Sequence, residues 1–175
     1  MPLRISPQQA EAAAPTILVR LLVGLVVFLP EGIQKLAFPE VLGSGRFAKI
    51  GIPFSDVMGP FVGTVETLCG ALIVLGLFTR LAAIPLIIIM IVAIVSTKIP
   101  ILLGHDLWIF HLASGMKRTG LWSTLHEART DFTMLLGSIY LLIEGGGRWS
   151  LDAWHSSIRS GHSARALNHS FERGA

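Results

Sequence analysis

The 175-residue sequence is 52% hydrophobic and 14% charged, whereas soluble domains carry about 25% charged residues. This composition excludes an ordinary soluble domain and predicts a single integral membrane domain. The net charge of +3 comes from basic residues scattered along the chain, which argues against nucleic-acid binding. Cys69 is the only cysteine, which excludes an internal disulfide, a CxxC redox pair and a cysteine-bound iron–sulfur cluster.

A polar tail, residues 1–15, leads directly into the first predicted span, residues 16–38. No small-residue cleavage site follows a short apolar core here, so we expect an uncleaved membrane helix. Arg20, Glu31 and Lys35 follow one another at spacings of eleven and four, which places them on one helical face. Glu31 and Lys35 stand in the favourable i, i+4 order for an ion pair. The charged face of this span is therefore expected to point into the protein.

Pro30 and Gly32 flank Glu31 near the end of the first span. Because proline has no N–H, the carbonyl of Val26 loses its helical donor. A break at membrane depth is tolerated only where protein or water satisfies the backbone. The pattern therefore predicts a kinked helix with a charge at the kink. The alternative is that the span ends near Pro30 and residues 31–38 lie at the membrane interface.

The second predicted span, residues 57–78, carries Glu66 close to its middle. A carboxylate at that depth costs about 2.5–3.5 kcal/mol on insertion scales, so we expect it to have a partner or a function. Gly59, Gly63 and Gly70 lie at −7, −3 and +4 from Glu66, on the same helical face. Small residues let a neighbouring helix approach closely, so this face is expected to point inward. Glu66 is then either a functional group or a structural carboxylate that holds helices together.

The third predicted span, residues 81–103, follows the second through a turn at residues 79–80, so the two spans form a tight antiparallel hairpin. Its middle is apolar on all sides, which indicates a helix with much lipid exposure. Lys98, near its end, can reach the interface or pair inward. Between the first two spans, residues 39–56 form a loop rich in Gly and Pro, and a short interfacial helix is expected near residues 46–52.

The longest predicted loop, residues 104–128, contains Trp108 and Trp122, aromatic residues of the kind found at membrane interfaces. Three histidines also lie in this loop: His105, His111 and His126. Their spacings of six and fifteen match no standard metal-ligand pattern. We therefore predict no metal site, and the role of the loop stays open.

A fourth predicted span, residues 128–146, carries Asp131 in its first turn, where a carboxylate suits the positive end of a helix. The glycines at 145–147 end this span, and a second polar tail occupies residues 154–175. The predicted fold is therefore all-α, an integral membrane four-helix antiparallel bundle over residues 16–153, with both termini on one side of the membrane.

Alternation of four spans brings charges from different helices into the same half of the membrane. We predict a polar pocket between the helices, open toward the 104–128 loop, with Glu66 at its floor as the candidate catalytic residue. The other charged candidates for this network are Arg20, Glu31, Lys35, Lys98 and Asp131. Gly59, Gly63 and Gly70 are assigned to helix packing.

The chain resembles the DoxX family of small bacterial four-helix membrane proteins over about residues 16–153. The order and spacing of several short blocks carry the resemblance: Arg20 with Gly24, Gly32 to Lys35, Glu66 with Gly70, Gly76 to Arg80, and Asp131 through Gly145 to Asp152. The 104–128 loop is longer and more polar than the family pattern. The resemblance implies a four-helix bundle in the bacterial inner membrane. The founding members of the family are subunits of a quinone-linked thiosulfate oxidoreductase, and others are associated with redox stress complexes.

Three functions fit these features, and the sequence leaves open whether the protein is an enzyme. The first is a membrane subunit of a quinone-linked redox complex, in which Glu66 exchanges protons beside Lys35 or Arg20. A non-covalently bound quinone is the cofactor expected in this hypothesis. Because no histidine lies inside a predicted span to ligate haem, any other electron carrier would come from a partner. The second is a non-enzymatic scaffold or assembly factor that binds membrane proteins through its glycine faces. The third is a transporter of small solutes or lipids.

The expected surroundings are the lipid bilayer, with a partner redox subunit or further copies of the chain as protein partners. Seven Lys and Arg residues fall on each side of the predicted membrane, so the positive-inside rule does not decide the orientation. The turn at Arg80 and the arginine-rich second tail favour termini in the cytoplasm.

Overall fold

The computed structural model describes residues 13–112 and 118–155. These residues form helices joined by loops and contain no β-strand beyond one isolated bridge between Leu107 and Phe110, which confirms the all-α prediction. Most of the two predicted polar tails lies outside the described residues. In chain order the helices are α2 (Ala13–Val26), η1 (Val27–Ile33), α3 (Gln34–Ala37), α4 (Ser44–Lys49), α5 (Ser55–Leu75), α6 (Thr79–Ala93), η2 (Ile94–Lys98), α7 (Ile99–Leu103) and α8 (Leu121–Glu144).

Three helical segments of the described chain are long and apolar enough to cross a membrane. They are Thr16–Ala37, which joins α2, η1 and α3; Ser55–Leu75, which is α5; and Thr79–Leu103, which joins α6, η2 and α7. The first helix continues through Pro30 to Ala37, so it does not end at the proline. Large apolar side chains are exposed on all three segments, as expected for helices that face lipid.

The remaining long helix, α8, has 24 residues and starts at Leu121, well before the predicted start at residue 128. Gly120, with a φ of 102°, ends the preceding loop, which is therefore shorter than the sequence indicated. The composition of α8 differs from that of the three apolar segments, because its first half carries the charged residues Glu127, Arg129 and Asp131. Length and composition thus identify three candidate spans, and the fourth span remains a prediction.

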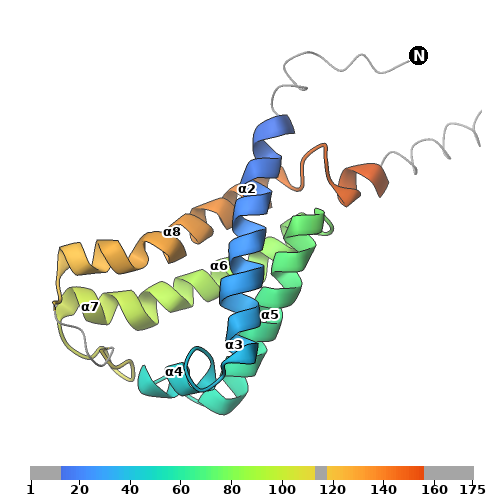
Figure 1. The fold of residues 1–175 in the computed structure, drawn as a ribbon. Helices are drawn as coiled ribbons and strands as arrows, with labels where there is room; N and C mark the ends of the chain where they lie inside the picture. The colour runs from blue at the N-terminus through green and yellow to red at the C-terminus, as the bar shows by residue number, and fades with distance from the viewer. Residues whose placement is uncertain (1–12, 113–117, 156–175) are drawn as a thin grey trace, which may run out of the picture.

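The helices lie in two pairs (Figure 1). The segment α2–η1–α3 lies beside α5, and the segment α6–η2–α7 lies beside α8. The pairs cross at an angle and are linked by the turn between α5 and α6. This turn occupies residues 76–78 rather than 79–80, because Gly76 takes the positive φ of 68° that ends α5.

The hydrophobic core lies where the two pairs meet, and all four long segments contribute to it. Its buried members are Val23, Val27, Ile73, Ala82, Ala83, Leu86, Met90, Met134 and Leu141. Farther from the α5–α6 turn the pairs diverge toward α4 and the loop that follows α7 (Figure 1). The core therefore joins the two pairs at the end near the α5–α6 turn.

Glycines bring α5 close to the first helix. A Cβ atom added to Gly70 would lie 2.7 Å from the backbone nitrogen of Phe28, and one added to Gly32 would lie 2.6 Å from the backbone nitrogen of Thr67. Such distances leave no room for a side chain, because real Cβ atoms essentially never approach backbone atoms within 3.0 Å. The face of α5 that the sequence assigns to the interior is buried at each position: Gly59, Gly63, Glu66 and Gly70.

Two π-helical turns interrupt the long helices, each close to a proline. η1 contains Pro30 and closes with a hydrogen bond from the N–H of Gln34 to the carbonyl of Leu29. η2 ends at Lys98, two residues before Pro100. A proline leaves the carbonyl one turn earlier without its usual donor, and a π turn adjusts the local hydrogen bonding. The break predicted at Pro30 thus takes the form of a π turn, whereas the sequence analysis did not single out Pro100.

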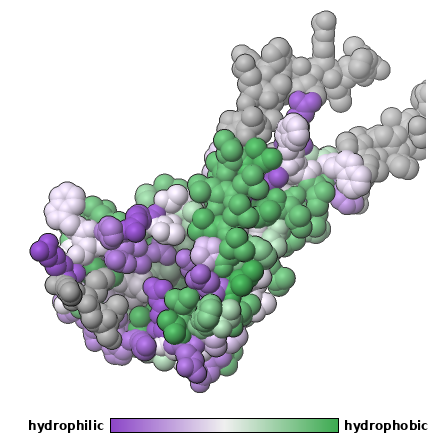
Figure 2. Space-filling model, in the orientation of Figure 1, coloured by the Kyte–Doolittle hydropathy of each residue, from purple (hydrophilic) through white to green (hydrophobic). Residues whose placement is uncertain are grey.

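The space-filling view separates an apolar region from a polar one (Figure 2). Apolar surface covers α2, whereas hydrophilic residues gather between the first half of α8 and the α3–α4 segment. The opposite end of the molecule holds both described chain ends, where Thr16 Oγ1 lies 3.1 Å from the Tyr140 hydroxyl oxygen. The polar surface therefore lies at the diverging end of the two helix pairs.

Candidate functional site

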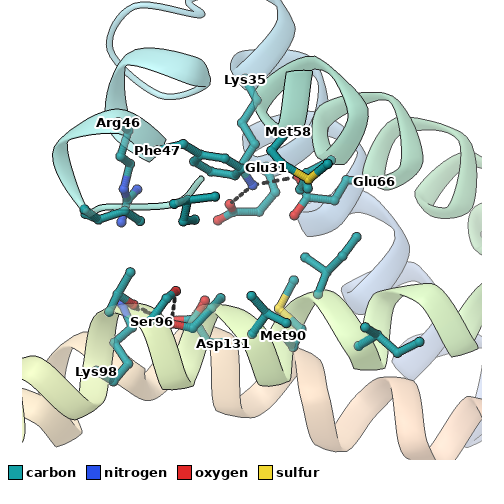
Figure 3. Close-up of a pocket in the computed structure, with 18 of the residues that line it drawn as sticks. Glu31, Lys35, Arg46, Phe47, Met58, Glu66, Met90, Ser96, Lys98 and Asp131 are labelled. Carbon is teal, nitrogen blue, oxygen red and sulfur yellow. Dashed lines mark hydrogen bonds and ion pairs between the residues drawn. The ribbon is translucent and has the colours of Figure 1, made fainter. Parts of the chain in front are cut away.

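A cavity of about 450 Å³ lies between the two helix pairs, at the end where they diverge. One wall comes from η1, α3, α5 and the α4 segment, and the opposite wall comes from α6, η2 and α8 (Figure 3). The lining includes most of the charged candidates that the sequence predicted: Glu31, Lys35, Glu66, Lys98 and Asp131. Its volume falls within the range of about 300–1,000 Å³ that is typical of small-molecule sites.

Lys35 joins two carboxylates on the first wall. Its Nζ lies 2.6 Å from Glu66 Oε2 and 3.0 Å from Glu31 Oε2, so the predicted i, i+4 ion pair is present. The Glu66 side chain is only 1% exposed and that of Lys35 11%, whereas Glu31 is 35% exposed. The pair between Lys35 and Glu66 is therefore the buried one, and Glu31 lies at its edge.

Glu66 has one oxygen in this ion pair and one oxygen without a hydrogen-bond partner in the described part of the chain. Glu66 Oε1 is buried and unpartnered, and Figure 3 shows the carboxylate at the edge of the cavity. A buried polar atom without a partner is costly, at about 1–3 kcal/mol. The site therefore lacks a hydrogen-bonding group at Glu66 Oε1.

The opposite wall carries its own ion pair. Lys98 Nζ lies 3.0 Å from Asp131 Oδ2, with side chains 8% and 21% exposed. Lys98 comes from η2 and Asp131 from α8, so the pair also joins the two helices of this wall. Of the two alternatives for Lys98, the structure has the inward pairing. The two ion-paired groups face each other across the cavity (Figure 3).

Both π turns contribute to this cavity. η1 supplies Glu31, and η2 supplies Ser96, Thr97 and Lys98. A π turn adds a residue to one turn of the helix and so rotates the side chains that follow it. π turns occur frequently at functional sites, and here one lies on each wall of the cavity.

Apolar side chains line the space between the charged groups. Phe47 is buried, and Met58 and Met90 approach from opposite walls (Figure 3). Phe61 of α5 and Ile88 of α6 also line the cavity, although each is 57% exposed on the outer surface of an apolar segment. The cavity therefore has polar groups on two walls and an apolar side toward the outside of α5 and α6.

Arg20, the remaining charged candidate, does not line this cavity. It is buried near the chain ends, where its Nη1 donates a 2.7 Å hydrogen bond to the carbonyl of Gly146. Nearby, Asp152 accepts hydrogen bonds from the backbone N–H groups of Phe78 and Thr79. Helical periodicity places Arg20 on the same face as Glu31 and Lys35, but it lies at the other end of the helix.

The loop after α7 forms a small hydrogen-bonded unit around Asp106. Asp106 Oδ1 accepts a 2.7 Å hydrogen bond from the N–H of Leu112, and Asp106 Oδ2 lies 2.9 Å from His111 Nδ1. The hydrogen bond from the Leu112 N–H is the larger cause that holds the pKa of Asp106 below its usual range, and the contact with His111 is the next. The N–H of His111 bonds the carbonyl of Ile50, which ties the loop to the α4 segment. The described residues contain no group of three or more metal-binding side chains.

Several residues at the polar mouth of the cavity carry no signal in the sequence pattern. Arg46 of α4 and Glu127 and Thr130 of α8 are exposed and contribute to its lining. The helix-forming run after Gly120 is the signal for the start of α8, although the sequence prediction places residues 121–127 in a loop. Arg46 lies in the short helix expected near residues 46–52, and only the packing of α4 against α5 brings it to the cavity.

The structure and the comparisons define a helical membrane protein, with three described segments apolar enough to cross a bilayer. Residues 16–99 match the DoxX family, and the chain belongs to that family. It is 51% identical over 148 residues, or 82% of each chain, to the uncharacterized membrane protein Rv3486 of Mycobacterium tuberculosis (strain ATCC 25618 / H37Rv). No solved structure gives a significant match. The family match includes Lys35, Glu66 and Lys98, whereas α8 with Asp131 lies beyond it.

Proposed function

We propose that this protein is an integral membrane subunit of a quinone-linked redox complex and that the cavity between the helix pairs binds the quinone. The observation that carries the proposal is the buried Glu66 Oε1, which has no partner in the described chain and lies beside the Lys35 ammonium. The founding members of the DoxX family, which this chain resembles, include subunits of a quinone-linked oxidoreductase. The proposal therefore combines that resemblance with the chemistry of one pocket.

The residues of the first wall fit a quinone in both of its redox forms. A bound quinone would supply two-electron chemistry coupled to proton transfer, with electrons exchanged through a partner redox subunit. Protonated Glu66 has an O–H that can donate to a ring carbonyl, whereas ionised Glu66 accepts from a ring hydroxyl. Lys35 keeps Glu66 in position through its ion pair and neutralises the carboxylate when the proton leaves.

The apolar side of the cavity fits the tail of a membrane quinone. Phe61, Ile88 and Val92 line the cavity and are also exposed on the surface of α5 and α6. A prenyl chain placed between these residues would remain in contact with lipid. This arrangement allows the ligand to enter from the bilayer, where membrane quinones are dissolved.

We also infer that α8 is the fourth span of an antiparallel four-helix bundle in the bacterial inner membrane. Its exposed apolar side chains lie on one face, at positions Leu125, Phe132, Leu136, Ile139 and Ile143. The exposed Trp122 and Trp149 lie near its two ends, where aromatic residues favour the membrane interface.

Single cysteines that replace Trp122 and Trp149, in a Cys69→Ser background, should react with a membrane-impermeant maleimide from opposite sides of the membrane. Labelling of both positions from one side would contradict a fourth span.

The direct test of quinone binding compares wild type, Glu66→Gln and Glu144→Gln. Glu144 is an exposed carboxylate at the last residue of α8 and does not line the cavity. Its substitution is therefore the matched control. Each protein would be purified in mild detergent, and the bound quinone per chain would be quantified by mass spectrometry. We expect near-stoichiometric quinone in wild type and in the control, and a loss on the order of tenfold or more in Glu66→Gln. Circular dichroism would verify that all three proteins keep their helix content.

Two results would contradict the proposal: no quinone in any sample, or equal amounts of quinone in wild type and Glu66→Gln. Either result would favour the scaffold or transport hypotheses. The scaffold hypothesis would then need a different surface, because the glycine face of α5 is buried within the chain.

A further inference from the structure

The second wall of the cavity has a role that the proton-exchange chemistry of Glu66 does not explain. Lys98 is buried, comes from a π turn and lines the same cavity as Glu66 from the opposite side. A lysine inside an apolar span is costly and is normally paired or functional. Its pairing with Asp131 balances the charge of the ammonium, but does not account for the position of Lys98 opposite Glu66.

The Lys98 ammonium has hydrogen-bonding capacity beyond its ion pair. An ammonium carries three N–H donors and no acceptor, and Lys98 Nζ has its ion-pair contact with Asp131 Oδ2 at 3.0 Å. The neighbouring Ser96 is also buried, and its hydroxyl reaches the carbonyl of Ala93 only at 3.5 Å, the limit for a hydrogen bond. The second wall therefore presents the Lys98 ammonium to the cavity, and the Ser96 hydroxyl, which lines the same wall, has only this long bond to Ala93.

The two walls thus offer complementary polar groups at opposite ends of one apolar space. The first wall presents the unpartnered Glu66 Oε1 next to Lys35, and the second presents Lys98 next to Ser96. Phe47 and Met58 flank the charged groups of the first wall, and Met90 lies beside those of the second (Figure 3). A molecule with one polar end would satisfy only one wall, whereas a flat apolar ring with an oxygen at each end would satisfy both.

We propose that Lys98 binds the second oxygen of the ligand, so that the site selects rings with two opposed oxygens over rings with one. This inference rests on the proposed quinone function and specifies how the ring is held. Asp131 is a positioning residue, because it fixes the ammonium through the ion pair. Lys98 is then a specificity-determining residue, and Glu66 remains the residue that exchanges the proton.

The test uses a short-chain naphthoquinone and the matching tetralone, which lacks one of the two ring oxygens. Binding of each to the purified protein in nanodiscs would be measured by calorimetry. Wild type is expected to bind the quinone on the order of tenfold to a hundredfold more tightly than the tetralone, the range for one hydrogen bond to a charged group. Lys98→Met should remove this preference by weakening quinone binding alone. Glu66→Gln should weaken both ligands.

Three further variants keep the test decisive. Lys98→Met together with Asp131→Leu also removes the part-buried carboxylate that loses its partner in the single variant, so it should fold even where the single variant does not. Lys98→Arg retains a charged donor and should retain part of the preference. Lys49→Met is the matched control, because Lys49 is exposed on α4 and does not line the cavity.

The possible results separate this inference from the function on which it rests. Failure of wild type to bind either ligand would overturn the quinone proposal. Equal binding of both ligands by wild type, or an unchanged preference in the folded Lys98 variants, would overturn the role of Lys98 and leave the quinone proposal in place. Loss of the preference in the Lys98→Met variants, with the Lys49→Met control unchanged, would support it.

Discussion

The ion pair between Lys35 and Glu66 allows a prediction in which two substitutions of one pair have very different costs. Lys35→Met would leave Glu66, which is 1% exposed, beside Glu31 with no cation between them. Breaking a buried pair in this way costs about 3–5 kcal/mol, because a buried charge is left uncompensated. Glu66→Met would instead leave Lys35 paired with Glu31 at 3.0 Å, so its cost should be small.

The double variant, Lys35→Met with Glu66→Met, should recover most of the stability lost in Lys35→Met. It replaces a buried ion pair with apolar side chains of similar volume, which is often neutral or stabilising. Glu31 would lose its partner, but its side chain is 35% exposed and can reach water. A strong and favourable coupling between the two substitutions is therefore expected.

Thermal unfolding in one detergent and at one scan rate would measure this cycle. For a chain of 150–250 residues, 1 kcal/mol corresponds to about 2–4 °C in Tm, so Lys35→Met should lower Tm by about 6–20 °C. Glu66→Met and the double variant should remain within a few degrees of wild type, as should Lys49→Met on exposed α4. Equal losses in the two single variants, or additive losses in the double variant, would refute the reasoning.

Three other predictions test packing, capping and pH dependence. Gly70→Ala should lower Tm, because the new Cβ would lie 2.7 Å from the Phe28 nitrogen. Overpacking of this kind costs about 1–3 kcal/mol, whereas the gain in helix propensity is about 1 kcal/mol. Asp152→Ala should cost about 0.5–2 kcal/mol and speed proteolysis after α8, because Asp152 caps the start of α6 at the N–H of Thr79; an unchanged rate would contradict that role. The Asp106 pKa is lowered in the folded loop, so its stabilising effect should be complete above the usual pKa of about 4 and disappear as pH falls below it. Hydrogen exchange should show protection of the loop lost at low pH in wild type and already absent at neutral pH in Asp106→Ala.

Local sequence was enough to predict three apolar helical segments and the inward face of α5. A run of about 20 apolar residues is long enough to span a bilayer whatever its neighbours are, and three such segments are present. The glycine spacing around Glu66 depends only on helical periodicity, as does the i, i+4 pairing of Glu31 with Lys35. These features required no knowledge of how the helices cross.

The partners of the buried charges were decided by the tertiary structure. Periodicity gives the face of a residue on its own helix, but not its depth or its rotation relative to another helix. Arg20 and Lys35 share a face, yet Arg20 bonds Gly146 near the chain ends while Lys35 bonds Glu66 in the cavity. The crossing of the helix pairs and the close approach at the glycines set these distances. Lys98 lies in the π turn before Pro100, and only the packing of α8 against α6 and η2 brings its partner Asp131 to it.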